Sequence, residues 1–356
     1  MIEVTKTFVP PLEEFIGFVR EAYATGQLTN DGPLVKRLEE ALGKRLGFDH
    51  VVLTANGTLA LQVALQASYV GPQDEVVTPA LSYVATPAAV ASMGAKPVLA
   101  DIDPYTLCMT TQEAQAAVTD RTRAFLPVHV YGNLCDVGAF EDLSEETGIP
   151  VVYDAAHAFD AKVERLDRLR NAWVYSFHAT KLFHTVEGGC VATNDADLAD
   201  RARHVRNFGH DPSRPYHFKG LGQNAKLSEI HAAMGLAVLP HVPEIISRRG
   251  AVVAVYDNLL RRSCLLPHRA AGNVAYYPLL FPAEAELLYV EHRLLKEDIH
   301  PRRYFYPSLS SLSYVERLET PVADSVAPRL LCLPLSHDIS VAEAKRIAEI
   351  VLEGHP

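Results

Sequence analysis

The chain has 356 residues, of which 48% are hydrophobic and 21% are charged, and its formal net charge is −10. This composition predicts a globular protein of more than one domain, and the negative charge argues against nucleic acid as a partner. Five cysteines without a close CxxC pair, no apolar run near ~20 residues and no signal-like start predict a cytoplasmic protein without metal, disulfide or membrane span.

Short apolar runs alternate with helix-like segments from about residue 35 to residue 235. The pattern predicts helices over 39–46 and 59–67, and strands over 50–53, 75–77, 96–100, 124–128 and 150–153. Helices between apolar strands indicate βαβ units and a parallel or mixed sheet. Functional groups gather at the carboxyl ends of such strands, where Asp101, His129 and Asp154 stand.

The pattern changes after residue 238, where two prolines interrupt the chain. Beyond them it predicts a smaller α+β domain, with a long helix over 244–261, a strand over 275–281, and helices over 284–297 and 342–352. Ser340 and Glu343 form a predicted capping box for the last helix. We therefore predict a large domain over 1–238 and a small C-terminal domain over 239–356.

One stretch of the chain indicates a cofactor. Lys181 ends a short strand-like run, Ser176 precedes it by five residues, and Asp154 ends an apolar strand about 27 residues earlier. This layout is typical of a lysine that forms a Schiff base with pyridoxal phosphate (PLP), with the carboxylate at the pyridine nitrogen and the hydroxyl at the phosphate. The apolar neighbours Phe177 and Phe183 predict a lowered pKa for the lysine.

Other residues suit the same cofactor but also have simpler interpretations. The segment 56–58, Asn-Gly-Thr, opens a predicted helix and can hold a phosphate, although such a tripeptide alone is more often a plain N-cap. Tyr83 can stack on a pyridine ring or belong to the core. Asp154 by itself can equally cap the next helix. His157 can reach the phenolic oxygen or orient Asp154, although a structural histidine is the more frequent case.

Together these residues resemble the DegT/DnrJ/EryC1/StrS family, the PLP-dependent nucleotide-sugar aminotransferases of fold type I. The resemblance runs nearly end to end and includes 28–33, 56–58, 127–132, 154–158, 176–181, 206–209, 222–230 and 333–336. It implies an α/β fold like that of aspartate aminotransferase, with a large mixed seven-stranded sheet domain and a smaller α+β C-terminal domain.

The resemblance also implies residue roles. It makes Lys181 the Schiff-base lysine and proton shuttle, with Asp154 and His157 as the other catalytic residues. The implied cofactor-binding residues are Gly57, Thr58, Tyr83, Asp154, His157, Ser176, Lys181 and Asn224. Asn224 matches an asparagine that the family supplies from the partner subunit, which implies a homodimer with shared active sites. The expected substrate-binding residues are Lys226, Tyr304 and Tyr306.

Two features depart from the family pattern. The segment 160–168 lacks the glycines that relatives often carry between the Asp-Ala-Ala motif and the lysine. Lys226 stands where many relatives have arginine, so a point charge replaces a bidentate clamp.

The resemblance implies that an amino group moves from L-glutamate to a keto sugar nucleotide in two half-reactions. We predict C4 of dTDP-4-keto-6-deoxyglucose as the acceptor, giving dTDP-4-amino-4,6-dideoxyglucose, with C3 amination of a 3-keto isomer as the alternative. Two rival functions are a PLP-dependent sugar-nucleotide dehydratase and a non-catalytic regulator. Lys181 argues against the first, because some dehydratases replace that lysine by histidine, and the filled cofactor positions argue against the second.

Overall fold

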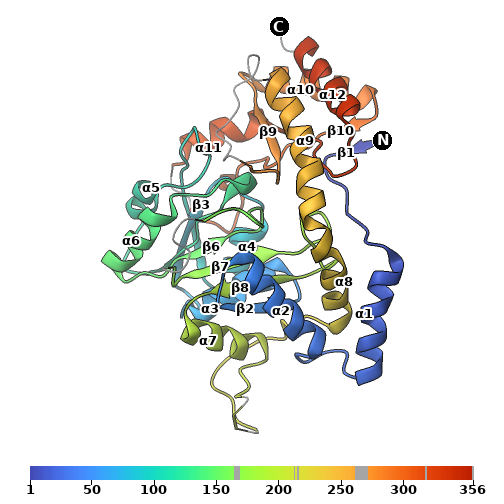
Figure 1. Cartoon of the computed structure of the whole chain (residues 1–356). Helices are drawn as coiled ribbons and strands as arrows, with labels where there is room; N and C mark the ends of the chain where they lie inside the picture. Colours follow the sequence, from blue (N-terminus) through green and yellow to red (C-terminus); the bar gives the residue numbers. More distant parts are fainter. Residues whose placement is uncertain (164–168, 212, 215, 261–271, 317–318, 355–356) are drawn as a thin grey trace.

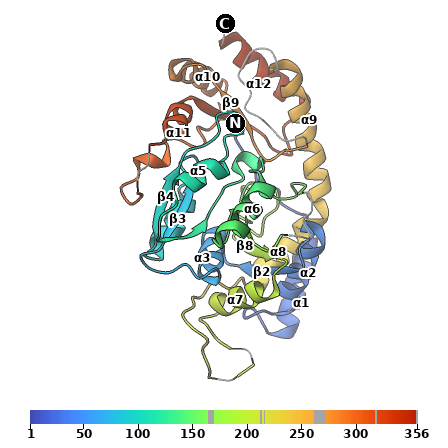
Figure 2. The same cartoon turned by 90° about the vertical axis from the view of Figure 1, so that its left-hand side faces the viewer.

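The computed structural model describes residues 1–163, 169–211, 213–214, 216–260, 272–316 and 319–354. Seven strands lie side by side within these residues in the order β4-β3-β5-β6-β7-β8-β2, because bridges at Phe125–Val151 and Val128–Asp154 join two smaller sheets (Figures 1 and 2). β8 runs antiparallel to both of its neighbours, β7 and β2. The expected mixed seven-stranded sheet is confirmed. The strands are β2 (His50–Thr54), β3 (Glu75–Pro79), β4 (Lys96–Ala100), β5 (Thr122–Phe125), β6 (Val152–Asp154), β7 (Ala172–Ser176) and β8 (Gly189–Thr193).

Helices cover both faces of this sheet (Figures 1 and 2). Successive residues of a strand point to opposite faces, so Val174 joins one buried apolar cluster while Trp173 and Tyr175 join the other. Burial on both faces explains why the strands read as apolar runs in the sequence. The helices of this part are α1 (Leu12–Thr25), α2 (Pro33–Leu46), α3 (Gly57–Ala67), α4 (Ala85–Ser92), α5 (Thr111–Ala116), η1 (Val130–Gly132), α6 (Val137–Thr147), α7 (Ala196–Arg206) and α8 (Glu229–Val238).

A smaller unit lies at the C-terminal end of the chain (Figure 1). β9 (Tyr277–Leu280) pairs antiparallel with β11 (Leu330–Leu333), and β10 (Ile299–His300) pairs parallel with β1 (Ile2–Glu3). The first residues of the chain therefore lie beside the last third, which the predicted division at residue 238 did not foresee. The remaining elements are η3 (Leu239–His241), α9 (Val242–Leu260), α10 (Glu284–Lys296), η4 (Leu309–Ser311), α11 (Pro321–Val326), η5 (Ala327–Arg329) and α12 (Val341–Gly354).

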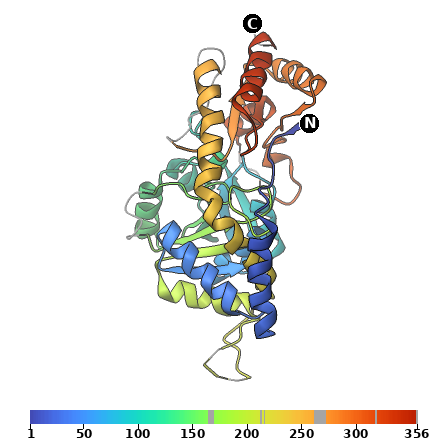
Figure 3. The same ribbon diagram turned by 45° about the vertical axis from the view of Figure 1, so that its right-hand side comes forward.

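A long helical run, α8 to α9, joins the two units (Figure 3). The stretch Glu229–Leu260 is long and apolar enough, by length and composition alone, to cross a membrane. It packs against α1 and α2 at its start and against α12 farther along, and it carries a buried Arg249. Packing inside the protein thus accounts for its buried residues, which make up 44% of the apolar window.

Two carboxylates cap the N-termini of helices by accepting hydrogen bonds from backbone N–H groups. Glu229 is buried, and its two oxygens accept hydrogen bonds from Leu34 N at 2.8 Å and Val35 N at 2.9 Å, so it caps α2 from another element. A Cβ at Gly32 would lie 2.5 Å from the Glu229 carboxyl carbon. The predicted capping box of α12 is confirmed, because Ser340 N donates to Glu343 Oε2 at 2.8 Å and Glu343 N donates to Ser340 Oγ at 3.2 Å.

Candidate active site

The carboxyl ends of β6 and β7 bring Asp154 and Lys181 together. The sequence suggested that Lys181 ends a strand. β7 ends at Ser176, however, and Lys181 lies in the turn that follows. Asp154 is buried and accepts hydrogen bonds from Thr86 Oγ1 at 2.8 Å and from Ala156 N at 3.1 Å. Burial raises the pKa of Asp154, and these two donors together with the Lys181 charge act against that rise. The carboxylate therefore gains from a further cationic donor, which a protonated pyridine nitrogen supplies.

The Lys181 amine is set up as a nucleophile and a proton carrier. Burial lowers its pKa to about 8, although Asp154, Tyr304 and Tyr83 act to raise it. A much larger share of the amine is then neutral near pH 8 than at an exposed lysine, and the neutral amine is the reactive form. Nζ donates a hydrogen bond to Tyr276 Oη at 3.3 Å.

The start of α3 forms a cradle for a small anion. The Asn56 side chain caps the helix by accepting from Leu59 N at 2.8 Å, so the first-turn N–H groups of Gly57 and Thr58 have no partner within the helix. A Cβ at Gly57 would lie 2.8 Å from Ser176 Cβ and 3.1 Å from Ser176 Oγ. Gly57 thus lets the end of β7 approach the helix, and its N–H group, that of Thr58 and the Ser176 hydroxyl lie close together. This donor set fits a phosphate.

A methyl group at position 57 tests the cradle. We expect Gly57→Ala to weaken PLP binding by about 10- to 100-fold, because overpacking against Ser176 costs ~1–3 kcal/mol and displaces the phosphate donors. An absorbance titration of the cofactor-free protein with PLP measures the effect. Gly250→Ala is the matched control, because a Cβ there meets nothing within 4 Å. Equal affinity of both variants for PLP would show that the start of α3 does not bind the phosphate of the cofactor.

His157 packs among aromatic side chains close to Lys181. Its buried ring stacks on Phe305, with centroids 5.3 Å apart and planes at 11°, and meets the edge of Tyr276 at 5.1 Å. Burial lowers the pKa of His157, and the neighbouring Lys181 lowers it further, so the ring stays neutral at neutral pH. The His157 Nδ1 atom is buried and has no hydrogen-bond partner in the described part of the chain. A buried, unpartnered ring nitrogen is a suitable contact for the phenolic oxygen of PLP.

A hollow of about 440 Å³ lies between Tyr83 and the segment 302–312 of the small unit. Tyr83 is 55% exposed and its ring lies 6.2 Å from Phe305. Tyr304 and Tyr306, which were predicted to bind substrate, both line this hollow, and Leu309 N ties the segment to Ala80 O at 2.9 Å. Tyr83 and Tyr304, which line this hollow, also act to raise the pKa of Lys181, so the hollow is the candidate pocket for a substrate that reaches Lys181.

Asn224 and Lys226 lie at a different place. Lys226 Nζ donates to Asn224 Oδ1 at 2.6 Å and lies 4.8 Å from the centre of the Phe208 ring. Their segment runs beside the end of β2, where Ala55 N donates to Ala225 O at 2.8 Å. No contact within the described residues joins either side chain to Lys181 or Asp154 of the same chain. Their predicted roles in cofactor and substrate binding remain predictions.

Two polar residues at other strand ends have structural roles. The Asp101 carboxylate accepts from Val322 N and Ala323 N, each at 2.9 Å, and so caps α11. His129 is fully buried between Tyr153 and Trp173 and accepts from Cys135 N at 3.2 Å. These contacts within the fold account for Asp101 and His129, and a functional role at the third strand end, that of Asp154, stays a prediction.

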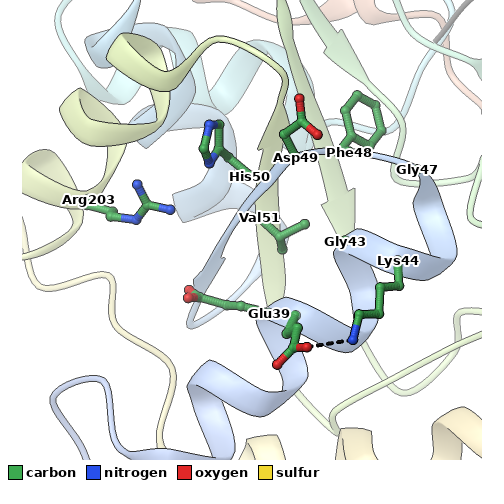
Figure 4. Close-up of a pocket in the computed structure, with 10 residues that line it drawn as sticks. Glu39, Gly43, Lys44, Gly47, Phe48, Asp49, His50, Val51 and Arg203 are labelled. Carbon is green, nitrogen blue, oxygen red and sulfur yellow. Dashed lines mark hydrogen bonds and ion pairs between the residues drawn. The ribbon is translucent and has the colours of Figure 1, made fainter. Parts of the chain in front are cut away.

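A second hollow, of about 590 Å³, lies beside α2, the start of β2 and α7 (Figure 4). Its lining includes Glu39, Lys44 and Arg203 but neither Lys181 nor Asp154. It is not part of the candidate active site. The glycine-poor segment at 160–168 falls mostly outside the described residues, so its predicted effect on the pocket rim stays a prediction.

Residues 12–352 match the DegT/DnrJ/EryC1/StrS aminotransferase family. The chain is 36% identical to the dTDP-4-amino-4,6-dideoxy-D-glucose transaminase of Shigella dysenteriae, over 95% of each chain. It is also 36% identical to the UDP-2-acetamido-2-deoxy-3-oxo-D-glucuronate aminotransferase of Pseudomonas aeruginosa, over 89% of each chain. Among solved structures, DesI in the presence of its TDP-sugar product is similar, with a TM-score of 0.90, 34% identity, and coverage of 99% of this chain and 92% of DesI.

Proposed function

Because the chain belongs to the DegT/DnrJ/EryC1/StrS aminotransferase family, it is a PLP-dependent sugar-nucleotide aminotransferase, and we propose that it aminates C4 of dTDP-4-keto-6-deoxyglucose. We propose L-glutamate as the amino donor, 2-oxoglutarate as the keto product and dTDP-4-amino-4,6-dideoxyglucose as the amino product. The relative that carries the C4 proposal is the Shigella transaminase, which aligns over 95% of this chain.

Amination at C3 is the second candidate. The Pseudomonas relative is named for a 3-oxo sugar and has the same 36% identity, over a smaller share of each chain. Sequence identity alone therefore does not decide which carbon of the sugar receives the amine. The larger chain coverage of the Shigella relative favours C4, and the TDP-sugar product of DesI favours a dTDP sugar.

Residues at the strand ends and at the start of α3 would each hold a different part of the cofactor. Bound PLP supplies an electron sink that lets the carbon next to the transferred nitrogen give up its proton. We propose that the Gly57 and Thr58 N–H groups and the Ser176 hydroxyl hold its phosphate, that Asp154 accepts from the pyridine nitrogen, and that Tyr83 stacks on the ring. His157 would then meet the phenolic oxygen through its unpartnered nitrogen.

Lys181 would bind the cofactor and move the proton in each half-reaction. The amine accepts the proton from the donor carbon of glutamate and, in the second half-reaction, delivers one to the sugar carbon as the general acid. A pKa of about 8 suits both directions, because the amine exchanges protons readily near neutral pH. Tyr304 and Tyr306, at the edge of the 440 Å³ hollow, would orient the sugar nucleotide.

A panel of substrates tests the proposed reaction. The purified protein is given PLP, L-glutamate and separate samples of a 4-keto and a 3-keto dTDP-6-deoxyhexose. NMR of each product locates the nitrogen. We expect amination of the 4-keto sugar at C4. Turnover of the 3-keto sugar alone would show that the enzyme aminates C3 and not C4. Loss of water in place of amination would identify a dehydratase.

We further propose that the enzyme is a cytoplasmic homodimer in which each active site takes Asn224 from the partner subunit. The segment after α7 projects away from the sheet (Figures 1 and 2). Several of its apolar side chains are exposed, including Phe208 at 48%, Phe218 at 56% and Leu221 at 82%. An exposed apolar surface of this kind favours contact with another subunit.

Mixed dimers test the sharing of sites. Lys181→Ala and Asn224→Ala chains with different tags are co-expressed, and the mixed dimer is isolated. If sites are shared, one site carries both substitutions and the other carries neither. We expect the mixed dimer to regain about half the activity of the wild-type dimer by this site count. If Asn224 serves its own chain, neither site is intact and activity stays at the level of the single variants.

A further inference from the structure

Tyr276 contacts the Lys181 amine and has no role assigned so far. It directly precedes β9, so the small unit delivers it to a lysine of the large sheet domain. Its hydroxyl accepts the hydrogen bond from Lys181 Nζ at 3.3 Å, and its ring centre lies 5.8 Å from the same atom.

The Tyr276 side chain is held on several sides. It is 8% exposed, and its ring packs edge-to-face against His157 at 5.1 Å, Tyr304 at 5.8 Å and Tyr131 at 6.2 Å. Behind it, the buried Arg249 donates from one guanidinium nitrogen to Val274 O and Ala275 O, each at 3.3 Å. Little freedom remains for the hydroxyl, so its position determines where the lysine amine rests.

We infer that Tyr276 is a positioning residue that holds the ε-amine of Lys181 in place for proton transfer. This inference rests on the role proposed above for Lys181. A neutral phenol oxygen that accepts from an ammonium stabilises the charged form more than the neutral amine. Burial raises the pKa of Tyr276, so the phenol keeps its proton across the working pH range.

Other charged and titratable groups also face this pair. Lys181 faces Asp154, Tyr83 and Tyr304, and its charge acts on His157. Tyr276 in turn faces Arg249 and Cys332. Substitution of Tyr276 by phenylalanine leaves all of these in place and removes only the hydroxyl. The remaining change in the lysine pKa then reports the hydrogen bond.

The first test uses the protein without cofactor. Lys181 is labelled with acetic anhydride over a range of pH, and the labelled peptide is quantified by mass spectrometry. We expect the midpoint of labelling near pH 8 in the wild type and about 0.5–1 pH unit lower in Tyr276→Phe, because a hydrogen bond to the ammonium is lost. The ring and its packing remain, and a thermal melt checks that the variant is folded.

Tyr277→Phe is the matched control. Tyr277 is the next residue, is 1% exposed, and donates its hydroxyl to Asp257 Oδ1 at 3.0 Å on the other side of the strand. We expect its labelling midpoint to equal that of the wild type. An unchanged midpoint in Tyr276→Phe would overturn the inference, whatever happens to its activity.

The second test separates positioning from substrate binding. With PLP, glutamate and the keto sugar, we expect Tyr276→Phe to lower kcat by about 10- to 100-fold and to leave both KM values within about twofold. A rise in KM with unchanged kcat would overturn the positioning role. These outcomes are distinct from failure of the proposed function, which would appear as absent transamination in the wild type.

Discussion

Replacement of Lys181 by alanine is expected to abolish transamination. The variant loses both the amine that bonds to PLP and the group that moves the proton, so we expect kcat to fall by at least about 10³-fold. The amine is well suited to both tasks, because burial lowers its pKa to about 8 and Tyr276 Oη lies 3.3 Å from it. Release of 2-oxoglutarate from glutamate measures the loss.

A covalent readout accompanies this variant. Borohydride reduction of the wild type with PLP should attach the cofactor irreversibly to the peptide that contains Lys181, as seen by mass spectrometry. Lys44→Ala serves as the control, because Lys44 is exposed and pairs with Glu40 on the surface of α2. Attachment of PLP to another lysine, or full activity in Lys181→Ala, would show that the assignment is wrong.

The second large effect is expected at Asp154. Asp154→Asn keeps the size of the side chain and an acceptor for Thr86 Oγ1, but it removes the negative charge. Loss of one partner from a buried charge pair costs ~3–5 kcal/mol, so we expect kcat to fall by about 10²–10⁴-fold. The pyridine nitrogen would no longer be kept protonated, and the absorbance spectrum of bound PLP should change together with the rate.

Asp101→Asn is the control for that effect. Asp101 is also a buried carboxylate after a strand of the same sheet, but it caps α11. We expect it to lower the melting temperature, since loss of a helix cap costs ~0.5–2 kcal/mol, and to leave the PLP spectrum unchanged. If both variants lost activity and stability to the same degree, Asp154 would be structural too.

Local sequence patterns predicted much of the fold. The alternation of apolar runs and helical segments predicted β2, β3, β4 and β6 to within a few residues, because both faces of those strands are buried. The resemblance, not the local pattern, supplied the number of seven strands, and their order came only with the structure. β1 could not be predicted, because two residues carry no periodicity and their partner strand lies about 300 positions away.

The part of the candidate site that could be predicted consists of residues whose types and spacing in the sequence are typical of a PLP site. Lys181, Ser176 and Asp154 meet at neighbouring strand ends because parallel strands bring their carboxyl ends to one edge. Tyr276 was missed, since it stood inside an apolar stretch that read only as a strand. Phe305 was missed for a similar reason, because its place beside His157 depends on how the small unit folds onto the sheet domain.

The pairing of β1 with β10 has a consequence for the order in which the protein can be made. Ile2 leaves the ribosome about 300 residues before its partner Ile299, and the Leu335 N–H group that donates to Val4 O is synthesised later still. The small unit therefore cannot be completed until most of the chain has emerged, and such distant pairing slows folding. A fragment that began at residue 239 would leave the edge of β10 unpaired and open to other chains.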